Sequence, residues 1–112
     1  MFGGHSSSFI VPPGTPVISI GPCLPNGVGG YYRNCIWQNV VGEWFPGDEI
    51  TVYISSDNIT FSVLSGPVLP GSLPYLIPIN VPAISLFYIK ALVTRRGING
   101  AFCATQLSNI CP

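Results

Sequence analysis

Few residues in this 112-residue chain have the chemistry of catalysts, and none of them forms a catalytic pattern. Asp48 and Glu49 are adjacent, so in a strand their carboxylates would point to opposite faces, which does not suit paired acid–base work. The single histidine, His5, lies in a Gly/Ser-rich segment that could not hold a general base in a fixed geometry. We therefore predict that the protein is not an enzyme.

Two other short motifs could bind or carry a group. The segment Gly27-Val28-Gly29-Gly30 is rich in glycine, but no lysine follows at the spacing of a phosphate-binding loop and no helix is indicated. We expect no cofactor. Asn58-Ile59-Thr60 is a formal glycosylation sequon, which matters only if the chain passes through a glycosylating secretory route.

The four cysteines, Cys23, Cys35, Cys103 and Cys111, could form disulfides or bind zinc. Disulfides are favoured, because the chain has no Cys-x-x-Cys motif and its histidine is distant in sequence. Three pairings are possible. The pairs Cys23–Cys35 and Cys103–Cys111 are preferred, because each would close a short loop, and disulfides predict an oxidising location.

Other side chains suit contact with a protein partner. A short apolar segment near the N-terminus could add to the edge of a neighbouring sheet. Two aromatic residues beside a Pro-Gly turn could form an apolar interface, and two arginines are expected at a hairpin tip. These interface candidates are Phe9, Ile10, Val11, Trp44, Phe45, Arg95 and Arg96.

The charge content argues against several partners. Only 7% of the residues are charged, and four basic residues balance four acidic ones. A neutral chain has no basic face for nucleic acid, and no apolar run reaches the ~18–20 residues of a membrane span. The N-terminus also lacks the basic and apolar regions of a signal peptide. Low net charge promotes association, so we expect other protein subunits as partners, in a homo-oligomer or multi-copy assembly.

The apolar pattern predicts an all-β chain. Alternation with a period of two residues, interrupted by Gly and Pro, indicates about seven short strands and no long helix. The expected strands are 17–20, 31–41, 50–55, 58–63, 75–81, 86–94 and 101–107. The prolines of the 75–81 strand place it at a sheet edge, and Phe87, Ile89, Ala91 and Val93 are expected to face the core.

Several of these segments together resemble a known type of domain. Residues 16–22 (PVISIGP), 45–52 (FPGDEITV) and 78–97 (PINVPAISLFYIKALVTRRG) are similar to the immunoglobulin-like TIG/IPT type. The resemblance covers roughly residues 16–107 and implies a single antiparallel β-sandwich. It implies a domain at 16–112 after an extended N-terminal arm at 1–15, used to bind or cover surfaces rather than to catalyse.

Three functions follow from these expectations. The first is a virion protein, a small immunoglobulin-like subunit that decorates or cements a capsid. Disulfides place the chain at the virion surface or elsewhere outside the cell. Release of virions by cell lysis would bring it there without a signal peptide. The second is a subunit of an extracellular filament or surface layer, joined by donation of residues 9–11. The third is a carbohydrate- or receptor-binding module of a secreted protein, with Tyr31, Tyr32 and Trp44 as its platform.

Overall fold

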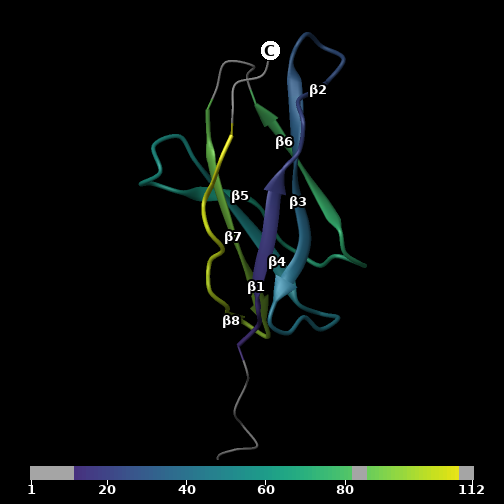
Figure 1. Cartoon of the computed structure of the whole chain (residues 1–112), viewed down its shortest axis with the longest axis vertical. Coiled ribbons are helices and arrows are strands. Elements are labelled where there is room, and N and C mark those ends of the chain that lie inside the picture. The colour runs from purple at the N-terminus through teal and green to yellow at the C-terminus, as the bar shows by residue number, and fades with distance from the viewer. Residues whose placement is uncertain (1–11, 82–85, 109–112) are drawn as a thin grey trace, which may run out of the picture.

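The computed structural model describes residues 12–81 and 86–108, and within these ranges the chain contains strands and turns and no helix. The prediction of an all-β antiparallel sandwich is confirmed. Figure 1 shows the strands arranged in two layers that run along the long axis of the molecule. Alternating apolar residues of the strands point inward, and they form the surfaces that the two layers bury against each other.

The first sheet is built around the longest strand. β3 (Tyr31–Val41) pairs with β1 (Thr15–Ile20) and β2 (Leu24–Pro25) along one edge and with β6 (Tyr75–Val81) along the other. All of these pairings are antiparallel. β6 pairs only with β3 among the described strands, so the prediction of an edge position for this proline-containing strand is confirmed.

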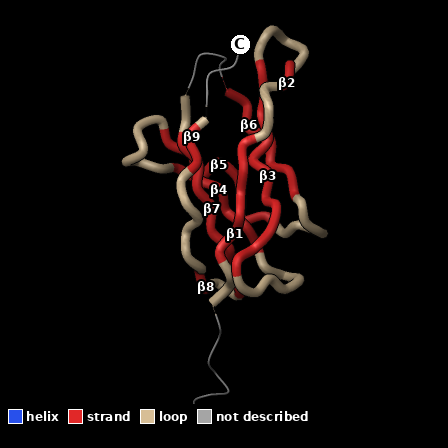
Figure 2. The backbone as a smooth tube through the Cα atoms, in the orientation of Figure 1, coloured by secondary structure: helices blue, strands red, loops and turns tan. Residues whose placement is uncertain are grey.

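The second sheet has β4 (Glu49–Ser55) near its centre. β4 lies between β5 (Ser62–Val68) and β7 (Tyr88–Arg95), and β7 also pairs with β8 (Ile98–Asn99) and β9 (Gln106–Leu107). Figure 2 shows that the segment between β8 and β9 runs as a loop along the sheet, so the strand expected at 101–107 is reduced to two residues.

The core lies between the two sheets. Trp37 of β3 is the largest fully buried side chain and is covered by apolar residues of the opposite sheet. The four residues expected to face inward from the 86–94 strand are all buried, which follows from their spacing of two. They are Phe87, Ile89, Ala91 and Val93.

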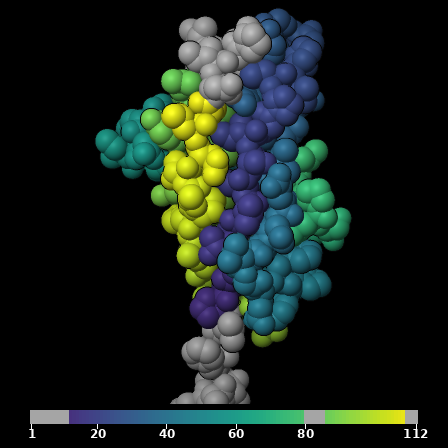
Figure 3. Space-filling model, viewed as in Figure 1, coloured from purple at the N-terminus to yellow at the C-terminus, as the bar shows by residue number. Residues whose placement is uncertain are grey.

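The C-terminal segment covers one open side of the sandwich. Figure 3 shows the yellow C-terminal residues alongside the purple β1, and β1 contacts both β7 and β9. The amide groups of Gly100, Cys103 and Ser108 donate to the carbonyl oxygens of Val93, Ala91 and Phe87 of the second sheet. This segment therefore links β7 to the edge of the first sheet.

Candidate ligand-binding face

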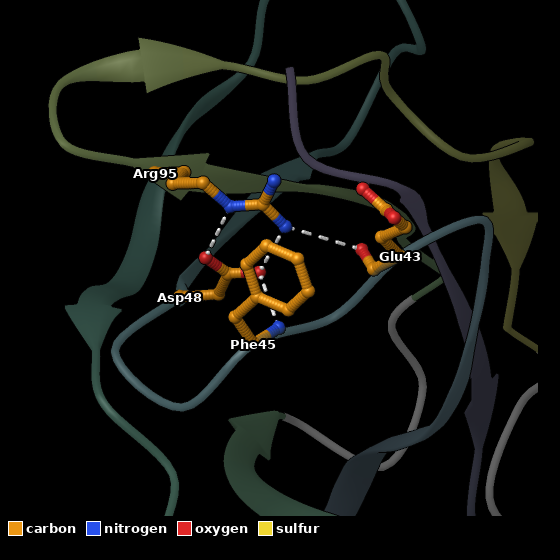
Figure 4. A network of polar contacts seen from close by, with 4 residues as sticks. All are labelled: Glu43, Phe45, Asp48 and Arg95. Atoms are coloured by element: carbon orange, nitrogen blue, oxygen red, sulfur yellow. Dashed lines mark hydrogen bonds and ion pairs between the residues drawn. The ribbon is translucent and has the colours of Figure 1, made fainter. Parts of the chain in front are cut away.

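The most extensive polar network joins the turn before β4 to the end of β7. Arg95 Nε and Nη2 each donate to one carboxylate oxygen of Asp48, both at 2.9 Å (Figure 4). The amide of Phe45 donates to Asp48 Oδ2 at 2.9 Å, and Arg95 Nη2 donates to the Glu43 carbonyl oxygen at 3.4 Å. Planar groups paired through two bonds fix orientation as well as distance.

The electrostatics of this network identify it as structural. Asp48 is 1% exposed and Arg95 is 8% exposed, so both charges are withdrawn from solvent. The hydrogen bonds from Arg95 lower the pKa of Asp48, although burial opposes the shift, and the amide of Phe45 lowers it further. The same pair raises the pKa of Arg95. Each charge is satisfied inside the chain, which leaves the network no free group for a ligand.

Some of the predicted interface residues near this network are exposed and others are buried. Arg95 belongs to β7 and is buried, so the expected position at a hairpin tip is wrong for Arg95 and right for Arg96, which lies in the turn with φ of 51°. The Phe45 ring is 48% exposed and lies under the Arg95 guanidinium at 4.2 Å. Trp44 packs edge-on against Trp37 with ring centroids 6.1 Å apart, so it serves the core.

A different group of side chains lies on the outer face of the second sheet. Lys90 of β7 stands directly opposite Tyr53 of β4. Its ammonium nitrogen lies 4.2 Å from the ring centroid of Phe61 and 4.1 Å from that of Phe102. The Phe102 ring in turn meets Tyr53 edge-on at 5.4 Å. We call Tyr53, Phe61, Lys90 and Phe102 the Lys90 cluster.

The Lys90 cluster combines one cation with exposed apolar surface. Phe102 is 43% exposed, Val63 opposite Tyr53 is 56% exposed, and Leu107 opposite Tyr88 is 56% exposed. Among residues 12–81 and 86–108, no carboxylate forms an ion pair with Lys90. Rings that flank an ammonium group displace part of its water, which increases its attraction for an anion. This face can therefore bind an anionic group beside an apolar one.

A third polar region is the loop between β4 and β5. Asp57 accepts hydrogen bonds from the amides of Ile59 and Thr60 and from the Ser55 hydroxyl, and these bonds lower its pKa to about 2. Asn58 of the sequon is exposed with φ of 62°. A hollow of about 340 Å³ lies nearby, but the Ser55 hydroxyl on its wall is already engaged by Asp57. The loop geometry accounts for these polar groups.

The cysteines differ from their predicted pairing. Cys35 and Cys103 carry free thiols, so the pairs Cys23–Cys35 and Cys103–Cys111 are both wrong. The short-loop argument failed because Cys35 lies in the middle of β3 with its side chain completely buried in the core. Cys23 is disulfide-bonded. Cys111 lies outside the described residues.

The remaining candidates are placed as follows. Tyr31 and Tyr32 are half-buried neighbours on β3, so their side chains point to opposite faces of the sheet and do not form one platform with Trp44. Phe9, Ile10, Val11 and His5 lie outside the described residues. Within the described ranges, no cluster of His, Cys, Asp and Glu side chains could hold a metal ion. No helix long and apolar enough to cross a membrane occurs there either.

The sequence signal for the Lys90 cluster was weak. Alternation with the inward-facing residues of the 86–94 strand predicts that Lys90 faces outward. The predicted strands at 58–63 and 101–107, which contain Phe61 and Phe102, give no sign that these rings lie beside it. The pairing of β4 with β5 and β7 and the path of the loop after β8 bring two phenylalanine rings around one ammonium group.

Comparison with known proteins gives a fold and no family. No protein-family model matches the sequence, and no curated protein matches it. Among solved structures, the chain is similar to the sensor domain of the anti-sigma factor RsgI4 of Pseudobacteroides cellulosolvens, with a TM-score of 0.53 and 12% identity. The match covers 86% of this chain and 75% of that domain. The resemblance to TIG/IPT domains stays a prediction.

This likeness corrects the first functional prediction. The capsid-decoration hypothesis took a small β-sandwich with few charges as a sign of a virion subunit. A solved structure that shares the fold is the sensor domain of an anti-sigma factor and not a capsid protein, so the prediction of a virion protein is wrong. Sparse charge and a sandwich fold occur in many kinds of binding module, so they are not specific evidence for a capsid subunit.

Proposed function

We propose that this chain is a non-enzymatic ligand-binding module of the sensing kind, and that it faces the outside of the cell. The likeness to an anti-sigma factor sensor domain supports a sensing role. The disulfide at Cys23 supports an oxidising location. In the described residues the polar network around Asp48 is satisfied internally, so the binding surface is assigned to the outer face of the second sheet.

The observation that carries this proposal is the environment of Lys90. Its ammonium group is held between two phenylalanine rings, and no carboxylate of the described residues neutralises it. Tyr53 and Tyr88 add phenolic hydroxyl groups on the same face, because Tyr53 lies opposite Lys90 and Tyr88 lies two residues before it in the strand. Cation, hydroxyls and apolar surface together suit a carbohydrate that bears carboxylates.

The test is a titration of the labelled protein with an oligosaccharide of uronic acids, followed by amide chemical shifts. A neutral oligosaccharide of the same length serves as the matched ligand. We expect shifts at β4 and β7 with the acidic ligand, and a weakening of about two- to fivefold in Lys90→Ala, the effect of one lost charge contact. Arg96→Ala removes an exposed cation from the β7–β8 turn and should leave the affinity unchanged.

Two results would overturn the proposal. One is an absence of binding to the acidic oligosaccharide at millimolar concentration by the wild-type protein. The other is equal affinity in the wild type and Lys90→Ala, because the cation would then make no contact. A folded Lys90→Ala protein is verified by an unchanged pattern of amide shifts in the first sheet.

A further inference from the structure

The two free thiols of the described chain, Cys35 and Cys103, both lie at the hydrophobic core. Cys35 is in the middle of β3 and is completely buried in the core between the sheets. Cys103 comes from the segment that covers the open side of the sandwich, and its side chain packs against the same core cluster. Cys35 belongs to the first sheet, and the loop that carries Cys103 is hydrogen-bonded to β7 of the second sheet.

Hydrogen bonds fix the position of the Cys103 sulfur. The Cys103 amide donates to the carbonyl oxygen of Ala91 at 3.0 Å, and the Ala91 amide donates to Cys103 Sγ at 3.3 Å. Ala91 is fully buried and belongs to the same cluster as Cys35. On the other side, Cys35 pairs with Ile20 of β1, and β1 is the strand of the first sheet that contacts β7.

The electrostatics agree with this closeness. Burial, with a smaller contribution from Cys103, raises the pKa of Cys35 to about 12. Burial also raises the pKa of Cys103. The influence of Cys103 on Cys35 agrees with the packing, because Cys35 belongs to the core cluster and Cys103 packs against the same cluster.

We propose that Cys35 and Cys103 form a second disulfide, which joins the two sheets across the core. Each thiol loses its proton, a sulfur–sulfur bond forms, and the two electrons pass to a small-molecule disulfide that is reduced to two thiols. Cys23 is already disulfide-bonded, so it does not compete for either of these thiols.

The environment also determines when the bond forms. The thiolate is the form that attacks a disulfide, and burial suppresses the thiolate of Cys35 in the folded protein. Oxidation therefore takes place while the chain folds, before the segment that carries Cys103 closes over the core. The finished bond is shielded from reductants by the same burial, which makes it structural and permanent.

The test is a thiol count on protein refolded with oxidised glutathione. The protein is denatured without reductant, alkylated and digested, and the peptides are analysed by mass spectrometry. We expect no alkylated cysteine and a cross-linked peptide pair that contains Cys35 and Cys103. Alkylated Cys35 or Cys103, or a cross-link from either to Cys23, would overturn the proposal.

A variant distinguishes the effect of the proposed Cys35–Cys103 bond from the effect of the disulfide at Cys23. Cys103→Ser cannot form the inter-sheet bond, so refolded protein should show a single alkylated residue, Cys35, and a melting temperature lower by about 10–20 °C, since the bond closes a long loop. If this variant does not fold, the thiol count of the oxidised wild type decides alone. Equal melting temperatures of the variant and the oxidised wild type would contradict the inter-sheet bond.

Discussion

Asp48 shows how one residue fixes the relation of two distant segments. It lies just before β4, and its carboxylate receives two hydrogen bonds from Arg95, which is 47 residues away along the chain. It also receives the amide of Phe45 and so closes its own turn. A buried ion pair gives little net stability when compared with an apolar pair, but loss of one partner leaves the other charge buried and unpaired.

We predict that Asp48→Asn lowers the free energy of unfolding by about 3 kcal/mol at pH 7, because it leaves Arg95 with a buried, uncompensated charge. Since the pKa of Asp48 is lowered in the folded state from its ordinary 3.8, the wild type keeps this stabilisation above that value and loses it as the pH falls through the folded pKa. Urea unfolding measured between pH 7 and pH 2 tests both statements.

The control for this prediction is Glu49→Gln, because Glu49 neighbours Asp48 in the chain but lies half-buried in β4 without an arginine partner. It should change stability by less than about 0.5 kcal/mol. Asp57, with its pKa lowered to about 2, adds to the acid loss in every variant. The Asp48→Asn curve should therefore be flatter than the wild-type curve but not level. Parallel curves would show that Asp48 does not cause the acid sensitivity.

At the scale of elements, the strands could largely be predicted from the sequence. The 31–41 and 75–81 strands match β3 and β6, because alternating side chains and flanking Gly or Pro residues mark both ends. The inward set of β7 was also predictable from its spacing. The alternation of apolar residues did not predict the structure correctly where side-chain hydrogen bonds or the path of a loop determine it.

β5 is the clearest example of this limit. The alternation of Ile59, Phe61 and Val63 predicted a strand at 58–63 and a loop after it, whereas β5 spans Ser62–Val68. Asp57 and Ser55 bind the amides of residues 57–60 and hold them in a turn, so the strand begins later. It then continues through Gly66, where the register with β4 is irregular.

We predict that Gly66→Ala disrupts the pairing of β5 with β4. Gly66 has φ of 111°, and an added Cβ would lie 2.5 Å from the Ile50 carbonyl oxygen and 3.0 Å from the Thr51 Cα. Backbone atoms cannot move away as a flexible side chain could, so we expect a loss of at least about 2 kcal/mol in the free energy of unfolding. Thermal or urea unfolding measures this loss.

Gly71→Ala is the matched control, because nothing lies within 4 Å of its added Cβ. It should leave stability unchanged or raise it slightly, since alanine restricts the unfolded chain. Equal effects of the two substitutions would show that the close approach of Gly66 to β4 is not required for the sheet. Amide exchange in β5 would locate the damage in Gly66→Ala.

The candidate site could not be predicted from the sequence for a related reason. Lys90, Phe61 and Phe102 are far apart in the chain and meet only through the β4–β7 register and the loop after β8. The same loop brings Cys103 to the core that holds Cys35. Both groupings depend on tertiary pairing, and neither has a motif of fixed spacing. Of the features of the Lys90 cluster, only the outward orientation of Lys90 follows from the period of two in its strand.

At the scale of the whole molecule, the most unusual property is the small number of charged side chains, 7% of the residues. Four positive and four negative side chains cancel, and Asp48 and Arg95 are buried against each other, so few charges remain to repel another copy of the chain. The chain has a single histidine, and the sequence has a pI of about 6.5. Net charge therefore stays close to zero over a wide range of pH.

We predict that the double variant Val28→Lys/Ile59→Lys is markedly more soluble than the wild type between pH 5.5 and 8, with an unchanged melting temperature. Val28 is 85% exposed and Ile59 is 83% exposed, so the lysines would add charge without disturbing the core. Val28→Ala/Ile59→Ala removes the same apolar surface without charge. If the alanine variant resists precipitation by polyethylene glycol as well as the lysine variant does, exposed apolar side chains rather than missing repulsion limit the solubility.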